Sequence, residues 1–112
     1  MSKSISEVME FLENHALAWH HWLLLLSLIK LGGCGTRAQI APVYKREGFS
    51  SPTIKQIMGT DIEELGEALK IDGSLDDLAD DTKICLNEDP DFRKFIKKNI
   101  KGVVSSFRTR KK

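Results

Sequence analysis

The sequence predicts an all-α protein with a helix-turn-helix-like core, built as one compact domain of about six or seven helices. Helix-capping patterns recur along its 112 residues, and apolar residues recur at the spacing of amphipathic helices. Strand-like alternation is nearly absent. A chain of this length is long enough for one core, so we expect a single helical domain over residues 1–106 and a basic tail over residues 107–112.

The first two helices are expected from Ile5 to about Ala16 and over residues 18–31. Ser4 and Glu7 form a capping box, in which the serine oxygen accepts from a first-turn amide and the glutamate reaches back. The second segment is apolar almost all round its circumference, and Gly32-Gly33 follows it. This pattern is typical of a buried central helix that ends at glycine.

Two further capping patterns predict the third and fourth helices. A second capping box begins at Thr36 and opens a helix over residues 36–46, which Pro42 would kink or make irregular at its start. Ser51 is predicted to cap the next helix, with Pro52 at its first position, where a missing amide costs nothing.

The following segment is strongly acidic and contains the one candidate for β-structure. A helix is predicted over residues 60–70, opened by Thr60. Residues 69–75, "LKIDGSL", suit either a very short β-hairpin turning at Asp72-Gly73 or a turn into a helix over residues 75–86. On that second helix, an acidic face would be formed by Asp76, Asp77, Asp80 and Asp81, either solvated or docked on a basic partner.

Charge separates sharply along the chain, although the net charge is only +1. Twelve of the sixteen acidic residues lie between Asp61 and Asp91, whereas nine of the seventeen basic residues follow from Arg93 onward. Asp89-Pro90 is expected to open the last helix, which combines this basic character with an apolar stripe. Such asymmetry is typical of an interaction segment, or of a solvated final helix.

No pattern predicts an enzyme, a cofactor, a metal site or a small-molecule substrate. His15, His20 and His21 lie five and six residues apart, not at the i, i+3 or i, i+4 spacing that puts two ligands on one helix face. Cys34 and Cys85 form no C-x-x-C pair, and reduced cysteines in the cytoplasm are the simpler expectation. The unbroken apolar run is too short for a membrane span.

The segment "TRAQIAPVYKREGFSSPTIKQIM" resembles the helix-turn-helix core of winged-helix DNA-binding domains. The resemblance implies a first helix over residues 36–46, a turn at Gly48-Phe49 and a recognition helix from Ser51. The exposed start of the second helix then enters the major groove. The acidic segment after Met58 would have to face away from the duplex.

This resemblance implies a small DNA-binding protein, a transcription regulator that acts as a homodimer. Residues near the start of the recognition helix would read bases, while basic residues of the preceding helix and the C-terminal segment would hold phosphates. The candidate DNA-binding residues are Arg37, Lys45, Arg46, Ser50, Ser51, Thr53, Lys55, Gln56, Lys97, Lys98, Lys101, Arg108 and Arg110. The alternative is a helical protein–protein interaction module, an adaptor, inhibitor or subunit that binds no DNA.

Overall fold

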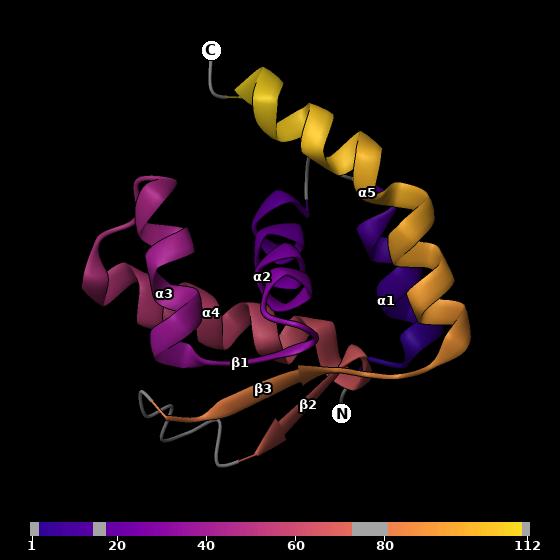
Figure 1. Ribbon diagram of the computed structural model, residues 1–112, viewed down its shortest axis with the longest axis horizontal. Coiled ribbons are helices and arrows are strands. Elements are labelled where there is room, and N and C mark those ends of the chain that lie inside the picture. The colour runs from indigo at the N-terminus through magenta and orange to yellow at the C-terminus, as the bar shows by residue number, and fades with distance from the viewer. Residues whose placement is uncertain (1–2, 15–17, 73–80, 111–112) are drawn as a thin grey trace.

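The computed structural model describes residues 3–14, 18–72 and 81–110 and shows a mainly helical molecule with a small sheet (Figure 1). The elements in chain order are α1 (Ile5–Leu12), α2 (Trp19–Lys30), β1 (Cys34–Thr36), α3 (Arg37–Arg46), α4 (Ser51–Leu65), the 3-10 helix η1 (Gly66–Ala68), β2 (Leu69–Asp72), β3 (Lys83–Leu86) and α5 (Pro90–Arg110). The prediction of a mainly helical fold is confirmed. The all-α prediction of six or seven helices is matched only in part, because the described residues form five α-helices, one 3-10 helix and a three-stranded sheet.

Helix α2 lies at the centre of the molecule, as its composition predicts. Figure 1 shows α3 on one side of it and α1 and α5 on the other. Trp22, Leu24 and Leu28 are fully buried, and the Trp22 indole Nε1 donates to the Leu12 carbonyl at 2.9 Å. Full burial of a leucine side chain stabilises a fold by about 1.5–3 kcal/mol. The core of the protein is therefore organised around α2.

The helix starts follow their capping residues closely. The predicted capping boxes at Ser4 and Thr36 are confirmed, and each side-chain oxygen accepts from the amide three residues later at 3.3 Å. Helix α4 begins one residue earlier than predicted, because Ser50 rather than Ser51 is its N-cap and Pro52 is its second residue. Proline is still harmless there, since the first four amides of a helix have no partner within the helix.

Helix α4 continues through the point where a new helix was predicted. Thr60 does not cap a helix: its hydroxyl donates to the Gln56 carbonyl at 3.1 Å, as in a continuing helix. Asp61 is fully buried and faces its neighbours in the core. The helix ends at Leu65, with Gly66 as its C-cap at a φ of 45°, and the chain continues through η1 into β2. The helix predicted over residues 60–70 is therefore confirmed over residues 60–65, but its separate start at Thr60 and its end near Lys70 are wrong.

The sheet has the strand order β1-β3-β2, and both pairings are antiparallel. Strand β2 falls within the predicted hairpin, but Asp72 pairs with Lys83, so the predicted two-residue turn at Asp72-Gly73 is wrong. The helix predicted over residues 75–86 is also wrong at residues 83–86, which form β3. Asp81 is exposed, whereas the rest of the predicted acidic face, Asp76, Asp77 and Asp80, lies outside the described residues.

A disulfide joins Cys34 of β1 to Cys85 of β3. The two residues are direct cross-strand partners, with Cα atoms 4.0 Å apart, although they are 51 residues apart in sequence. The expectation of two reduced cysteines is therefore wrong. Sequence spacing did not reveal the bond because only the antiparallel pairing of β1 with β3 brings the two side chains together.

The last helix, α5, begins as predicted. The Asp89 carboxylate accepts from the Phe92 amide at 3.0 Å, which caps the helix start. Its apolar stripe faces the core, with Phe92, Ile96 and Val103 buried. Over the described residues, no helix is both long enough and apolar enough to cross a membrane.

Candidate nucleic-acid interface and a buried polar cluster

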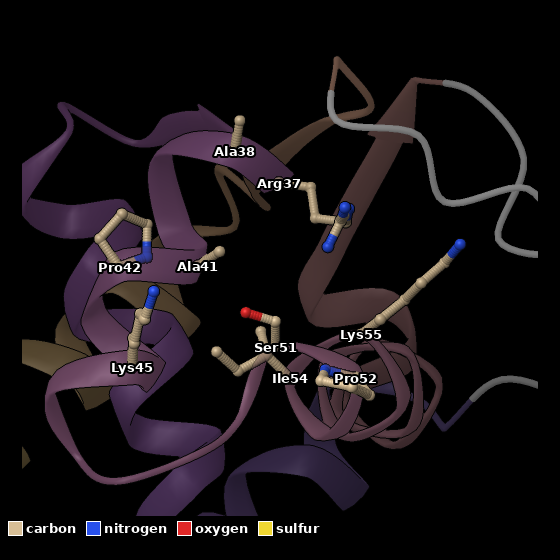
Figure 2. A pocket seen from close by; sticks show the side chains of 9 residues that line it. All are labelled: Arg37, Ala38, Ala41, Pro42, Lys45, Ser51, Pro52, Ile54 and Lys55. Carbon is tan, nitrogen blue, oxygen red and sulfur yellow. The ribbon is translucent and has the colours of Figure 1, made fainter.

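An open cavity of about 900 Å³ lies between α3 and α4 (Figure 2). We call it the basic pocket. It is lined by Arg37, Ala38, Ala41, Pro42 and Lys45 of α3 and by Ser51, Pro52, Ile54 and Lys55 of α4. Four of the thirteen candidate DNA-binding residues, Arg37, Lys45, Ser51 and Lys55, therefore meet around one cavity.

The electrostatics of the basic pocket favour an anion. Three of its lining residues are cationic and none of the nine is acidic. Figure 2 shows Arg37 and Lys55 toward one side of the cavity and Lys45 toward the other. The start of α4, which has no side-chain cap hydrogen bond, adds the positive end of the helix dipole. A phosphate oxygen is the kind of group that such a surface attracts.

Local sequence explains how the walls of the pocket are placed. The capping box at Thr36 starts α3, and the backbone amide of Arg37 donates to the Thr82 carbonyl beside β3 at 3.1 Å. Between the two helices, Gly48 takes a φ of 100°, and Phe49 stacks on Trp19 with ring centroids 5.7 Å apart. The turn predicted at Gly48-Phe49 thus sets the angle between α3 and α4.

Three other candidates lie beside the pocket at the start of α4. Gln56 is exposed, and the Ser50 and Thr53 hydroxyls are hydrogen-bonded to each other at 2.8 Å. Arg46 lies apart from them, because it lines a separate groove of about 180 Å³ together with Lys30 and Glu47. Lys45 and Arg46, although adjacent in sequence, thus contribute to different surfaces of the molecule.

The basic residues of α5 are not brought to the pocket. Lys97, Lys98 and Lys101 are exposed on α5, and Lys97 lines an apolar groove of about 190 Å³ that includes Ile96 and Ile100. Arg108 and Arg110 belong to the last turns of α5, but their side chains lie outside the described part of the chain. The first turns of α5 lie across α2 from α3 (Figure 1).

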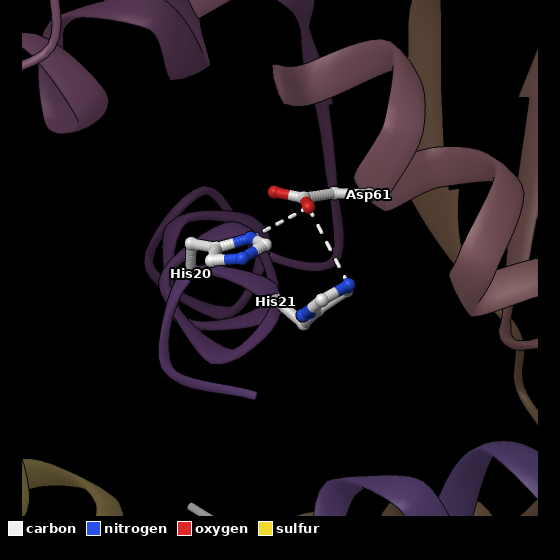
Figure 3. Close-up of side chains that lie close together, drawn as sticks. All are labelled: His20, His21 and Asp61. Atoms are coloured by element: carbon white, nitrogen blue, oxygen red, sulfur yellow. Dashed lines mark hydrogen bonds and ion pairs between the residues drawn. The ribbon is translucent and has the colours of Figure 1, made fainter. Parts of the chain in front are cut away.

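A second site, which sequence analysis did not predict, joins α2, α3 and α4. We call it the polar cluster, and it consists of His20, His21, Tyr44, Asp61 and Glu64. His20 Nδ1 lies 2.6 Å from Asp61 Oδ1, and His21 Nε2 lies 3.4 Å from the same oxygen (Figure 3). His21 Nε2 also lies 3.1 Å from Glu64 Oε1. The Tyr44 hydroxyl donates to Asp61 Oδ2 at 2.7 Å.

The surroundings of the polar cluster shift its protonation equilibria. The hydrogen bond to Asp61 raises the pKa of His20, in spite of partial burial. Burial lowers the pKa of His21, opposed by the nearby carboxylates. Burial, and then the negative charge of Asp61, raises the pKa of Tyr44 well above its ordinary value. Tyr44 is therefore a neutral hydrogen-bond donor at physiological pH.

The polar cluster was missed because its members come from different helices. Histidine spacing indicates only which ligands share one helix, and Asp61 directly follows Thr60, which resembles a helix cap. A usable signal was present: Asp61 follows Met58 by three residues and Ile54 by seven, so it falls on the buried stripe of α4. A carboxylate at such a position needs polar partners, and His20 and His21 supply them.

Comparison of the chain with known protein families, with curated proteins and with solved structures finds no match.

Proposed function

We propose that the protein binds duplex DNA through the start of α4, with the basic pocket holding a backbone phosphate. The observation that carries the proposal is the convergence of Arg37, Lys45, Ser51 and Lys55 on one open cavity without an acidic wall residue. These residues were predicted from sequence as DNA contacts, and two different helices supply them. Lysine and arginine side chains and helix N-termini are common phosphate contacts.

The order of elements supports this proposal. Two successive helices, α3 and α4, are followed by the antiparallel pair β2–β3, which stands where the winged-helix resemblance expects a wing. Exposed Lys83 of β3 pairs with Thr36, beside the start of α3. It is a further candidate for a phosphate contact, which sequence analysis did not include.

The acidic residues of α4 would repel DNA if they faced the duplex, so their positions bear on the proposal. The Asp61 carboxylate is buried against α2 and α3, and Glu64 faces His21. Of the three acidic residues on α4, only Glu63 is fully exposed. The first two turns of α4, which would enter the groove, carry Lys55 and Gln56 and no acid.

Base reading in this proposal belongs to Thr53, Lys55 and Gln56. A glutamine can pair with adenine through two hydrogen bonds, and a lysine can donate to guanine. Lys55 and Gln56 are exposed, whereas Thr53 is half-buried and hydrogen-bonded to Ser50. Lys55 is therefore a candidate for both a phosphate contact and a base contact.

Homodimerisation through α5 completes the proposal. Val104, 37% exposed on α5, and Leu31, 40% exposed, are large apolar side chains left at the surface. A second copy covering α5 would supply a second recognition helix. The Cys34–Cys85 disulfide argues against the cytoplasmic location expected from sequence, because a reducing cytoplasm keeps most cysteine pairs reduced.

The test is the binding of the intact chain to random-sequence duplex DNA, followed by fluorescence anisotropy across a salt series. Lys45→Ala and Lys55→Ala should each weaken binding and each reduce the slope of log K against log salt by about 1. Lys30→Ala is the matched control, because Lys30 is an equally exposed lysine on another surface. Its salt slope should equal that of the wild type.

Two results would reject the proposal. Absence of DNA affinity at low salt would leave the alternative of a protein–protein interaction module, with the apolar groove beside Lys97 as its candidate docking surface. Equal effects of Lys30→Ala and Lys55→Ala would mean that binding is only a matter of total charge. A truncation after Ser106 separates the contribution of the C-terminal basic residues from that of α4.

A further inference from the structure

We infer that the polar cluster is a binding site for one divalent transition-metal ion of the zinc type. The ligands are His20 Nδ1 and His21 Nε2 from α2, and Asp61 Oδ1 and Glu64 Oε1 from α4. The inference does not depend on DNA binding, because it concerns a different surface and different residues.

The donor atoms are already gathered at nearly the spacing that an ion needs. Zinc lies about 2.0–2.1 Å from its nitrogen and oxygen ligands, so two ligand atoms of a tetrahedral site are about 3.3–3.4 Å apart. His21 Nε2 lies 3.4 Å from Asp61 Oδ1 and 3.1 Å from Glu64 Oε1. The donor atoms of His20, His21 and Asp61 all lie within 4.8 Å of one another.

One pair of ligand atoms is closer than a metal site requires. His20 Nδ1 and Asp61 Oδ1 are 2.6 Å apart, which is the distance of a strong hydrogen bond. An ion would replace the proton shared in this bond, and the two atoms would separate by less than about 1 Å. His20 sits in the first turn of α2 with its side chain 27% exposed, so this movement needs no rearrangement of the core.

The charge of the site also favours a cation. Asp61 is completely buried and contacts the two histidines and Tyr44. A buried carboxylate needs a compensating positive charge, which either a protonated histidine or a bound cation supplies. Two carboxylates balance the two positive charges of the ion, and neutral imidazoles are ordinary ligands beside them.

Tyr44 provides the supporting contact expected around a metal ligand. Its hydroxyl holds Asp61 Oδ2 at 2.7 Å, which turns the other oxygen, Oδ1, toward both histidines. Carboxylate and imidazole ligands are commonly oriented by such hydrogen bonds. Asp61 Oδ1 therefore faces both histidines before an ion binds.

The His21 ring presents Nε2 to the polar cluster. Its Nδ1 is buried and has no hydrogen-bond partner among the described residues, so the polar contacts of the ring are made through Nε2. That nitrogen faces two carboxylate oxygens. Glu64, with its side chain 39% exposed, leaves an entry path from solvent.

The experiment uses the full chain after treatment with a chelator and removal of the chelator. Zn²⁺ is titrated in competition with a chromophoric chelator, and Co²⁺ is titrated while its visible absorption is recorded. We expect about one ion per chain and the intense visible bands of four-coordinate Co²⁺, as a four-ligand site requires.

The variants separate this site from surface binding. Glu64→Gln and His20→Gln should each weaken Zn²⁺ binding at least about tenfold, and Tyr44→Phe should weaken it about 10–100-fold through the lost orientation. Glu63→Gln is the matched control, since Glu63 is the exposed neighbour of Glu64 on α4. Circular dichroism of each metal-free variant checks that the fold is retained.

Three outcomes would overturn the inference. They are Zn²⁺ uptake below one ion per chain, equal affinities of Glu64→Gln and Glu63→Gln, and Co²⁺ spectra typical of six oxygen ligands. If Tyr44→Phe loses its fold, His20→Gln and Glu64→Gln still decide the question, because both side chains are partly exposed.

Discussion

At the scale of single residues, the Asp61 carboxylate connects three helices in the core. One oxygen faces His20 and His21 of α2, and the other accepts from Tyr44 of α3, while Asp61 itself belongs to α4. Three helices thus meet at one charged group. Buried polar networks of this kind stabilise a fold only while every member has its partner.

Removal of the Tyr44 hydroxyl should therefore destabilise the metal-free protein. In Tyr44→Phe, Asp61 Oδ2 loses its donor in a site where neither residue is exposed, so we expect a loss of about 1–3 kcal/mol in the free energy of unfolding. Urea denaturation in the presence of chelator measures it. An unchanged midpoint would mean that Asp61 finds another donor.

The basic pocket and the polar cluster differ in how far sequence predicts them. Arg37, Lys45 and Lys55 belong to helices whose starts are marked by local capping residues, so their exposure follows from helical periodicity. The contact between His20 and Asp61 spans 41 residues and depends on how α2 packs against α4. Local patterns carry no information about such a packing.

At the scale of secondary structure, local sequence likewise predicts where helices begin but not where strand β3 forms. Helices α1, α3 and α5 begin where their caps predict, because a cap acts within one turn. Strand β3 lies in a segment for which a helix was one of two predicted alternatives, and its residues are strand because β1 and β2 pair with it on both sides. Those pairings are long-range in sequence, so periodicity within 83–86 could not reveal them.

The end of α4 depends on a glycine that no other residue replaces easily. Gly66 has a φ of 45°, and a Cβ built there would lie 2.5 Å from the Lys3 carbonyl oxygen and 2.6 Å from the Lys3 amide nitrogen. The Glu67 amide donates to that same carbonyl at 2.9 Å. Gly66 thus permits the close contact between η1 and the chain before α1.

We therefore predict opposite effects at two glycines. Gly66→Ala should lower the free energy of unfolding by about 1–3 kcal/mol, because the backbone of Lys3 must move. Gly59→Ala is the matched control inside α4, where a Cβ meets nothing within 4 Å, and it should raise stability by about 0.5–1 kcal/mol. Thermal denaturation of both variants tests the pair, and equal changes would contradict the account.

At the scale of the whole molecule, the disulfide is expected to be a large single contribution to stability. It closes a loop between residues 51 positions apart. In the chain-entropy account, this closure raises the free energy of the unfolded state by roughly 4 kcal/mol. Reduction should therefore lower the urea midpoint strongly. The double variant Cys34→Ser/Cys85→Ser should behave like the reduced wild type, and a reductant should have no further effect on it.

That closed loop contains α3, α4, η1 and β2, which together carry the basic pocket, while α1, α2 and α5 lie outside it. The disulfide thus closes residues 34–85 into a covalent ring. The N-terminal and C-terminal segments leave this ring at Cys34 and Cys85, whose Cα atoms are 4.0 Å apart. A single peptide-bond cleavage inside the ring would open it without releasing a fragment. Cleaved protein should therefore migrate as one species until reductant is added, and only then separate into two pieces.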